Sequence, residues 1–284
     1  MNLTRTKEQK REEKLQHIRR FRLLDDDFMT KCFEDSVECT ELVLRIVMGI
    51  PDLSVQEVRT QYTVKNLQGR SARLDILAVD SKGKKYNIEI QKSNKGAGTK
   101  RARYNGSLLD ANSIEAGENV ENLPETYVIF ITEKDVIGSG LPVYHVERTV
   151  QETGEAFGDG SYIVYVNAEC TDDTPVGRLM HDFSCTNPND MNYKVLAERA
   201  RYFKEEEEGI EIMDQTLEEW IKQEAKEEAH EMAHEMAHEM AQEKVEDEKL
   251  KIARNLLWVL DDKIIADKTG LTLEKVQSLK TEEK

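Results

Sequence analysis

Apolar residues recur along the chain with two different periods, and these periods predict where helices and strands lie. In residues 25–49 they return every three or four positions, which predicts an amphipathic helix that ends near Gly49. Continuous or alternating apolar runs predict strands at 53–64, 74–91 (as a hairpin), 126–136 and 160–168. Further helices are predicted at 98–117, 175–183 and 190–221, and an irregular excursion at 142–160. This order predicts an α/β (α+β) fold in which helices flank a mixed β-sheet.

The character of the sequence changes beyond residue 221. Residues 222–250 are rich in Ala, Glu and Met, and the four-residue sequence EMAH repeats within them, which predicts one long helix. A strict four-residue repeat drifts around a helix, and this favours a lone or loosely associating helix over a stable heptad seam. The row of histidines in the repeat is compatible with a metal site, although a repeat on a solvated face explains it without a metal. Residues 251–284 predict a small helical hairpin with a turn at Gly270.

Charge is distributed unevenly over the 284 residues. The net charge is −16, and residues 198–249 alone contribute −12. The first 24 residues carry +5, and residues 92–103 carry +5 with no acidic residue, so the acidic total does not exclude a nucleic-acid partner. We therefore predict four parts: a basic arm at 1–24, a globular domain at 25–221, the charged EMAH helix at 222–250 and the hairpin tail at 251–284.

The sequence also bears on location. No apolar run approaches the roughly 18 residues of a membrane span, and the N-terminus lacks the apolar segment of a signal peptide. The four cysteines lack the spacing of a zinc site and are expected to be reduced. These observations predict a soluble, cytoplasmic protein with no membrane partner.

The hairpin at 74–91, LDILAVDSKGKKYNIEIQ, carries an acidic residue in each strand, where a strand that enters the core is normally apolar. If residues 81–83 form a three-residue loop with Gly83 in the left-handed conformation, paired residue numbers sum to 164. Asp75 then lies directly opposite Glu89, and we call these two residues the acid pair. In this register one face holds Leu74, Ile76, Ala78, Tyr86, Ile88 and Ile90, and the other holds Asp75, Leu77, Asn87, Glu89 and Gln91.

Two carboxylates that face each other across a sheet repel, so this register implies a compensating cation. Mg²⁺ takes oxygen ligands, and Asp75, Glu89 and the backbone carbonyl of Ile90 would provide three of them. The alternative is a solvent-exposed hairpin in which Arg73 or Lys84 neutralises the acids without a metal.

The pattern D-x13-E-x-Q, placed after a helix and a strand, resembles the PD-(D/E)XK nuclease superfamily, in particular its recombination-promoting nuclease (Rpn) branch of transposases. The segments RARYNGSLLDANSIEAGE and PETYVIFIT and residues 252–280 are similar to further elements of that branch. The resemblance covers about residues 25–185 and the C-terminal tail. It implies a restriction-endonuclease-like fold and a Mg²⁺-dependent DNA endonuclease of the recombination-promoting type, with Mn²⁺ or Ca²⁺ as alternative ions.

The resemblance also implies roles for individual residues. The acid pair would be catalytic and would bind the metal together with Ile90. Gln91, the third catalytic residue, stands where many members have lysine, so a neutral amide replaces a positive charge. The superfamily often adds an acid from its first helix, and we assign this metal-binding role to Glu38, with Glu41 as the alternative.

A basic segment follows the second strand of the hairpin. It suits the phosphate backbone of DNA, and the residues assigned to this contact are Lys92, Lys95, Lys100, Arg101, Arg103 and Tyr104. A solvated basic face without a ligand is the alternative. No motif in the segment reads base edges, so no target sequence is predicted.

Two other functions are compatible with the sequence. One is a catalytically weak DNA-binding or protein-interaction module derived from the nuclease fold, and the other is a ribonuclease. The long helix at 222–250 predicts either a spacer or self-association, so a homo-oligomer through the C-terminal helix is a further expectation.

Overall fold

The computed structural model describes residues 7–66, 69, 71–92 and 96–282. By its internal contacts the chain divides into two compact units, Met1–Leu217 and Glu218–Lys284. The hairpin and all residues assigned to catalysis or DNA contact belong to the first unit.

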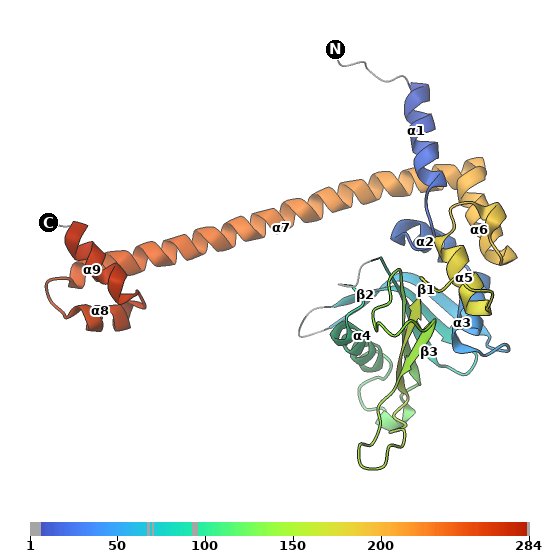
Figure 1. The fold of residues 1–284 in the computed structure, drawn as a ribbon, viewed down its shortest axis with the longest axis horizontal. Helices are drawn as coiled ribbons and strands as arrows, with labels where there is room; N and C mark the ends of the chain where they lie inside the picture. Colours follow the sequence, from blue (N-terminus) through green and yellow to red (C-terminus); the bar gives the residue numbers. More distant parts are fainter. Residues whose placement is uncertain (1–6, 67–68, 70, 93–95, 283–284) are drawn as a thin grey trace. The chain divides into compact units, whose positions relative to one another are not determined.

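A six-stranded mixed sheet forms the centre of the first unit (Figure 1). Its strands are β1 (Val55–Val64), β2 (Ala72–Asp80), β3 (Lys85–Gln91), β4 (Thr126–Thr132), β5 (Val143–Val146) and β6 (Ser161–Asn167). They lie in the order β1-β2-β3-β4-β6-β5. The pairs β3–β4 and β4–β6 are parallel, and the other pairs are antiparallel. The predicted mixed α/β fold is confirmed and is consistent with a restriction-endonuclease-like arrangement.

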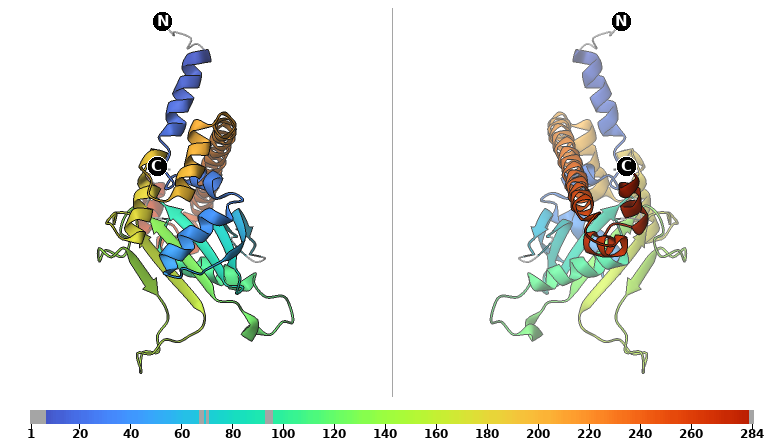
Figure 2. Two further views of the ribbon diagram at one scale, coloured as in Figure 1. Left: turned by 90° about the vertical axis from the view of Figure 1, so that its right-hand side faces the viewer. Right: turned by 90° about the vertical axis from the view of Figure 1, so that its left-hand side faces the viewer.

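Helices cover both faces of this sheet (Figure 1, Figure 2). On one face lies α4 (Thr99–Ala111), where Ala102 and Leu109 pack with Val128 and Phe130 of β4. The opposite face carries α2 (Asp26–Phe33), α3 (Val37–Met48), α5 (Pro175–Ser184) and α6 (Lys194–Glu205). Short 3-10 helices lie at Val120–Asn122 and Pro188–Asp190. The larger apolar core lies on the face opposite α4.

The helix predicted at 25–49 is two helices in the structure. It is interrupted after Phe33, where Asp35 has φ 55. Ser36 then begins α3 by accepting a hydrogen bond from the Cys39 N–H at 3.3 Å. The apolar spacing does not reveal this break, because Phe33 and Leu44 on its two sides reach the same core.

The excursion predicted at 142–160 contains a strand. Residues Val143–Val146 pair antiparallel with β6 as β5, and Thr149 forms an isolated bridge with Ala156. Four residues at a partly exposed sheet edge are too few to give a clear alternating pattern, so the sequence carries little signal for this strand.

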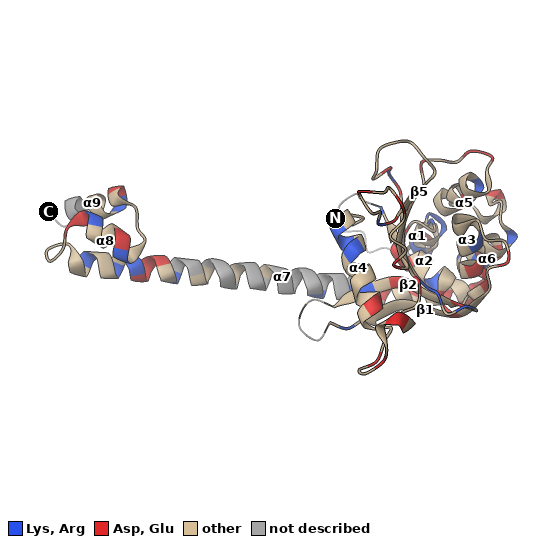
Figure 3. Ribbon diagram, turned by 90° about the horizontal axis from the view of Figure 1, so that it is seen from below, with Lys and Arg blue, Asp and Glu red and all other residues tan. Residues whose placement is uncertain are grey.

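The N-terminal arm contains α1 (Lys7–Arg19), part of which is blue with Lys and Arg in Figure 3. The last part of the arm enters the core through Ile18, Leu23 and Leu24. The Lys204 ammonium donates hydrogen bonds to the carbonyls of Arg19 and Phe21 at 3.4 and 2.5 Å, and burial lowers the pKa of this lysine to about 8. These contacts fix the chain just before α2 begins.

The 50-residue helix α7 (Glu207–Leu256) runs through the EMAH repeat, as predicted. In the second unit α8 (Asp262–Thr269) and α9 (Leu273–Glu282) form the predicted hairpin, with Gly270 at φ 69 in its turn. The core of this unit consists of Ala253, Leu257, Ile265, Leu271, Val276 and Leu279. The side chains of the repeat histidines lie outside the described residues, and self-association through α7 stays a prediction. Among the described helices, none combines the length and apolarity that a membrane crossing needs.

Candidate functional site

The acidic hairpin has the predicted register. Strands β2 and β3 pair from Val79↔Lys85 to Ile76↔Ile88, and the residue numbers of each pair sum to 164. Gly83 in the turn has φ 79, the left-handed conformation that the predicted loop requires. The acid pair lies one position beyond the last of these pairs, so the register is confirmed up to Ile76 and Ile88, and the direct opposition of Asp75 and Glu89 stays a prediction.

Leu74 departs from the predicted faces. It packs with Leu77 in the core under α4, and not with Ile76 in the larger core. Gln61 of β1, which lies between the β1 partners of Leu74 and Ile76, has φ 51. This conformation interrupts the pleat, and the predicted alternation of faces assumes a continuous pleat.

At the acid pair a hydrogen bond to a side chain replaces the backbone hydrogen bonds between β2 and β3. The Ile90 N–H donates to Oδ2 of Asp75 at 2.9 Å, where a regular antiparallel pair would use a backbone carbonyl. Asp75 is 8% exposed and Glu89 is fully buried. The two strands therefore separate here, and the Asp75 carboxylate bridges them from inside the protein.

The structure does not show the exposed, salt-bridged hairpin that was the alternative. Arg73 is exposed, and Lys84 pairs with Glu125 at 2.5 Å. The cation beside the acid pair is Arg101 of α4, whose Nη2 donates to Oε2 of Glu89 at 2.9 Å. The other carboxylate oxygen, Oε1, is buried and has no hydrogen-bond partner among the described residues.

Burial and mutual repulsion disfavour the charged forms of the acid pair. Burial raises the pKa of Asp75 to about 8, and the charges of Glu89 and Asp26 add to this shift. Burial also raises the pKa of Glu89, although the Arg101 guanidinium opposes the change. Two buried carboxylates of this kind are strongly favoured in their ionised forms by a cation that binds both.

The chemistry of the acid pair suits a hard divalent cation. Both side chains offer oxygen ligands, and Oε1 of Glu89 is a buried acceptor that a cation would satisfy. Within the part of the chain that the structure describes, no three His, Cys, Asp or Glu side chains are gathered in a metal-binding arrangement. A cation here would complete its coordination with backbone oxygens, water or substrate, and the Ile90 carbonyl stays a predicted ligand.

The acids predicted to assist from the first helix have other positions. Glu38 is exposed in the first turn of α3, and no hydrogen bond or ion pair joins it to the acid pair among the described residues. Glu41 accepts a hydrogen bond from the Val55 N–H at 2.9 Å and pairs with Arg45 at 2.5 Å. Glu41 therefore ties α3 to β1.

Asp26, in the first turn of α2, is an acid near the site that the sequence analysis missed. Its charge raises the pKa of Asp75, and its carboxylate accepts a hydrogen bond from the Gln61 amide at 3.4 Å. Gln61 also donates to the Thr30 hydroxyl at 2.8 Å while holding φ 51, a costly conformation for a residue with a side chain. A run of aspartates before a helix reads as a cap, so the sequence gives no sign of this contact.

Comparison with known families now assigns the chain. The model of the PD-(D/E)XK nuclease family transposases matches residues 53–256. The chain belongs to this family. The match confirms the resemblance seen in the hairpin, and no curated protein or solved structure matches the chain.

The family match contains the acid pair and Gln91, and it leaves out Asp26 and Glu38. PD-(D/E)XK nucleases generally use divalent metals, which agrees with the oxygen ligands that the acid pair offers. Asp75 and Glu89 are therefore two acids inside the matched range whose side chains offer the oxygen ligands that such metals take.

Gln91 ends β3 of this PD-(D/E)XK chain, in register with Thr132 of β4. Its side chain lies against Gly96, because a Cβ added to Gly96 would come within 1.6 Å of Oε1 of Gln91. The chain after β3 therefore needs glycine at this position to keep the amide where it lies.

For the nuclease activity proposed below, Gly96→Ala is expected to displace the Gln91 amide and to lower DNA cleavage about ten-fold, since small displacements at a reacting centre are costly. The amide can rotate away, so the free energy of unfolding should change by less than about 1 kcal/mol. Gly98→Ala is the matched control, because a Cβ there meets no atom within 4 Å. Cleavage rates and thermal denaturation of both variants provide the measurement, and equal cleavage by the two would exclude a role for the position of Gln91.

Two of the residues predicted to contact DNA, Lys92 and Arg101, form ion pairs with acidic residues of the protein itself. Lys92, directly after β3, pairs with Asp25 at 2.6 Å and so ties the end of the strand to the start of α2. Arg101 pairs with Glu89, as described above. Neither side chain has its charge free in this conformation.

The other predicted contacts lie on or near α4. Lys100 and Arg103 are exposed. Tyr104 is half-buried, and its hydroxyl accepts a hydrogen bond from the Asn66 amide at 3.1 Å. Lys95 lies outside the described residues. Lys100 and Arg103 thus give α4 an exposed basic surface, and both lie within two residues of Arg101 in the sequence.

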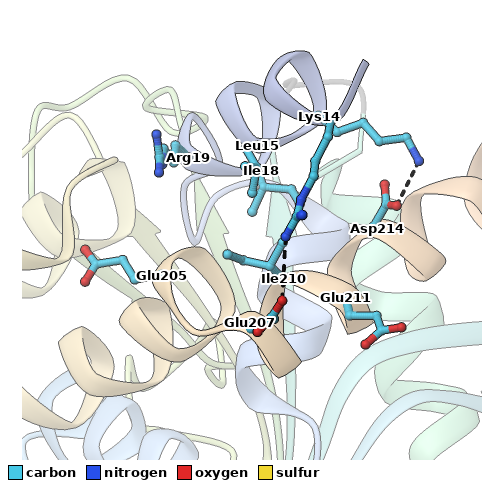
Figure 4. Close-up of a pocket in the computed structure, with 10 residues that line it drawn as sticks. Lys14, Leu15, Ile18, Arg19, Glu205, Glu207, Ile210, Glu211 and Asp214 are labelled. Atoms are coloured by element: carbon cyan, nitrogen blue, oxygen red, sulfur yellow. Dashed lines mark hydrogen bonds and ion pairs between the residues drawn. The ribbon is translucent and has the colours of Figure 1, made fainter. Parts of the chain in front are cut away.

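A cavity of about 700 Å³ lies elsewhere in the first unit, between α1 and the start of α7 (Figure 4). Arg11 pairs with Glu207 at 3.6 Å, and Lys14 pairs with Asp214 at 2.8 Å. No residue of the acid pair lines this cavity. The cavity is therefore separate from the buried acids that offer metal ligands.

Proposed function

We propose that this PD-(D/E)XK family member is a divalent-metal-dependent endonuclease that hydrolyses phosphodiester bonds of DNA. The observation that carries the proposal is the acid pair: two buried carboxylates placed where β2 and β3 separate, with one oxygen that has no hydrogen-bond partner in the described part of the chain. Mg²⁺ is the proposed cofactor, with Mn²⁺ or Ca²⁺ as alternatives. Action in recombination or transposition is proposed from the family alone.

In this proposal each residue of the site has a distinct task. Asp75 and Glu89 hold the cation, and Asp26 adds negative charge from the exposed side. The cation, when bound, supplies a water of lowered pKa and stabilises negative charge on the phosphate. The Ile90 N–H fixes the Asp75 carboxylate.

Gln91 has a narrower role than the lysine that it replaces. Its amide can donate a hydrogen bond to phosphate or accept one from the attacking water, but it cannot accept a proton at neutral pH. The contact with Gly96 holds the amide in place. Positioning of water or phosphate is therefore the task that we assign to Gln91.

The substrate side of the proposal rests on the basic residues of α4. Lys100 and Arg103 are exposed and would contact the phosphate backbone. Tyr104, with Lys92 and Lys95, is kept as a proposed contact. Phosphate contacts position DNA without reading its sequence, so we propose cleavage with little sequence preference.

The decisive experiment is a plasmid-nicking assay in Mg²⁺, Mn²⁺, Ca²⁺ and EDTA, with an RNA of matched length as a second substrate. We expect nicking of DNA in Mg²⁺ or Mn²⁺ and none in EDTA. Asp26→Asn should slow nicking several-fold, because the charge of Asp26 acts on Asp75. Glu38→Gln should leave nicking unchanged, because Glu38 is exposed and forms no hydrogen bond or ion pair with the acid pair among the described residues.

Other outcomes of this assay would support the alternatives. DNA binding without nicking in any divalent cation would indicate a catalytically weak binding module. Cleavage confined to RNA would indicate a ribonuclease. A stronger effect of Glu38→Gln than of Asp26→Asn would restore Glu38 as the assisting acid.

A further inference from the structure

Arg101 joins the surface of α4 to the buried acid pair. It lies in the first turn of the helix, and its side chain is 44% exposed, whereas the Glu89 side chain that it contacts is fully buried. The contact between Nη2 and Oε2 is 2.9 Å long. The guanidinium therefore reaches from solvent to a carboxylate that water does not reach.

The ion pair satisfies only part of this buried polar region. Four buried side-chain atoms near this ion pair have no hydrogen-bond partner among the described residues. They are Oε1 of Glu89, Oδ1 and Nδ2 of Asn87, and Nδ2 of Asn105. Asn105 lies one helical turn after Arg101 on α4, and Asn87 lies two residues before Glu89 on β3. Native proteins rarely leave so many buried polar atoms unpaired, so this region is suited to a further polar or charged group.

A divalent cation at the acid pair would compete with Arg101 for Glu89. Both cations neutralise the same carboxylate, and at short range they repel each other. Arginine keeps its charge at any pH reached in a cell, so its release requires movement of the side chain. The partly exposed side chain of Arg101 can move outward, toward the surface that carries Lys100 and Arg103.

We propose that Arg101 occupies the place of the divalent cation in the metal-free protein and turns to the phosphate backbone of DNA when the cation binds. This inference rests on the proposed function, because the displacing cation is the one that the nuclease uses. It makes Arg101 a DNA-contacting residue only in the metal-loaded state. Lys100 and Arg103 contact DNA in both states.

The first test measures Ca²⁺ binding without cleavage, by calorimetry and by the shift in melting temperature. Arg101→Gln should melt lower than wild type in EDTA, because Glu89 loses its partner, and should bind Ca²⁺ about ten-fold more tightly at a pH where both carboxylates are ionised. Lys100→Gln is the matched control, since it removes the same charge from the adjacent exposed position. Its Ca²⁺ affinity should stay within about two-fold of wild type.

The second test measures binding of a short DNA duplex in EDTA and in Ca²⁺. Arg101→Gln should weaken binding several-fold in Ca²⁺ and hardly at all in EDTA, whereas Arg103→Gln should weaken it equally in both. If Arg101→Gln does not fold, Arg101→Lys gives the same test. Lysine cannot form the two-pronged phosphate contact, so its loss in DNA binding should again depend on Ca²⁺.

The outcomes separate this inference from the proposed function. A wild-type protein that neither binds a divalent cation nor cleaves DNA removes the proposed function and this inference with it. A wild-type protein that binds Ca²⁺ and cleaves in Mg²⁺, while Arg101→Gln and Lys100→Gln share one Ca²⁺ affinity, overturns the inference alone. A loss of DNA binding by the Arg101 variants that is equal in EDTA and Ca²⁺ also overturns it.

Discussion

Replacing Asp75 by asparagine is expected to abolish DNA cleavage while leaving the metal-free protein at least as stable as wild type. Asparagine keeps an oxygen that can accept the Ile90 N–H at the position where Asp75 accepts it at 2.9 Å. It removes a carboxylate whose pKa burial raises to about 8 and whose charge repels Glu89. Loss of a metal-binding charge should slow cleavage roughly a thousand-fold, or about 4 kcal/mol of transition-state stabilisation.

Asp80→Asn is the matched control for this variant. Asp80 lies on the same strand and is also buried, but its carboxylate accepts hydrogen bonds from the Lys82 and Lys84 N–H groups at 2.8 and 2.9 Å and from the Tyr86 hydroxyl at 3.0 Å. Its replacement should cost about 1–3 kcal/mol of stability and leave the cleavage rate per folded molecule near wild type. The two variants thus distinguish an effect on cleavage from an effect on stability, at two buried acids of the same strand.

Nicking assays in Mg²⁺ and thermal denaturation in EDTA measure both effects. Asp75→Ala should be equally inactive but less stable than Asp75→Asn, because it also removes the acceptor of the Ile90 N–H. Wild-type cleavage by Asp75→Asn, or a loss of stability in EDTA as large as that of Asp80→Asn, would contradict the assignment of Asp75 to the metal.

The register of the acidic hairpin could be predicted from the sequence because its geometry is local. The loop that ends at Gly83 fixes the register, and a one-residue slip would turn the apolar residues of one strand to the face opposite those of the other strand. The burial of Asp75 and Glu89 then follows from strands whose neighbours on both faces are covered by helices. The mixed sheet could be predicted for a similar reason, since most of its strands have strong apolar runs.

The contacts of the acid pair could not be predicted, because they join segments distant in sequence. Arg101 belongs to a basic run that reads as a DNA contact, and only the packing of α4 on the sheet brings it to Glu89. Asp26 reads as a helix cap, and only the conformation of Gln61 and the placement of α2 bring it near Asp75. Glu38 is assigned from its place in the segment EDSVECTELVLRIVMGI, and only the packing of α3 shows that this residue faces solvent.

The metal-free protein is expected to lose stability as the pH rises from about 4 to about 8. Asp75 has its ordinary pKa of 3.8 in the unfolded chain, and burial raises its pKa to about 8 in the folded protein. Between these values the folded protein keeps a proton that the unfolded chain releases, so the stabilising effect is full below the lower value and is lost as the pH passes through the higher one. Each pH unit in this window should cost up to about 1.4 kcal/mol for one proton.

Denaturant unfolding in EDTA across this pH range measures the slope, with two comparisons. Asp75→Asn should flatten it, leaving only the smaller part that comes from the raised pKa of Glu89. Saturating Ca²⁺ should reduce the loss of stability with rising pH in wild type. The cation binds the ionised carboxylates, so its affinity rises with pH. A wild-type slope that neither the substitution nor Ca²⁺ changes would place the titrating groups elsewhere and would remove the electrostatic basis for a cation at the acid pair.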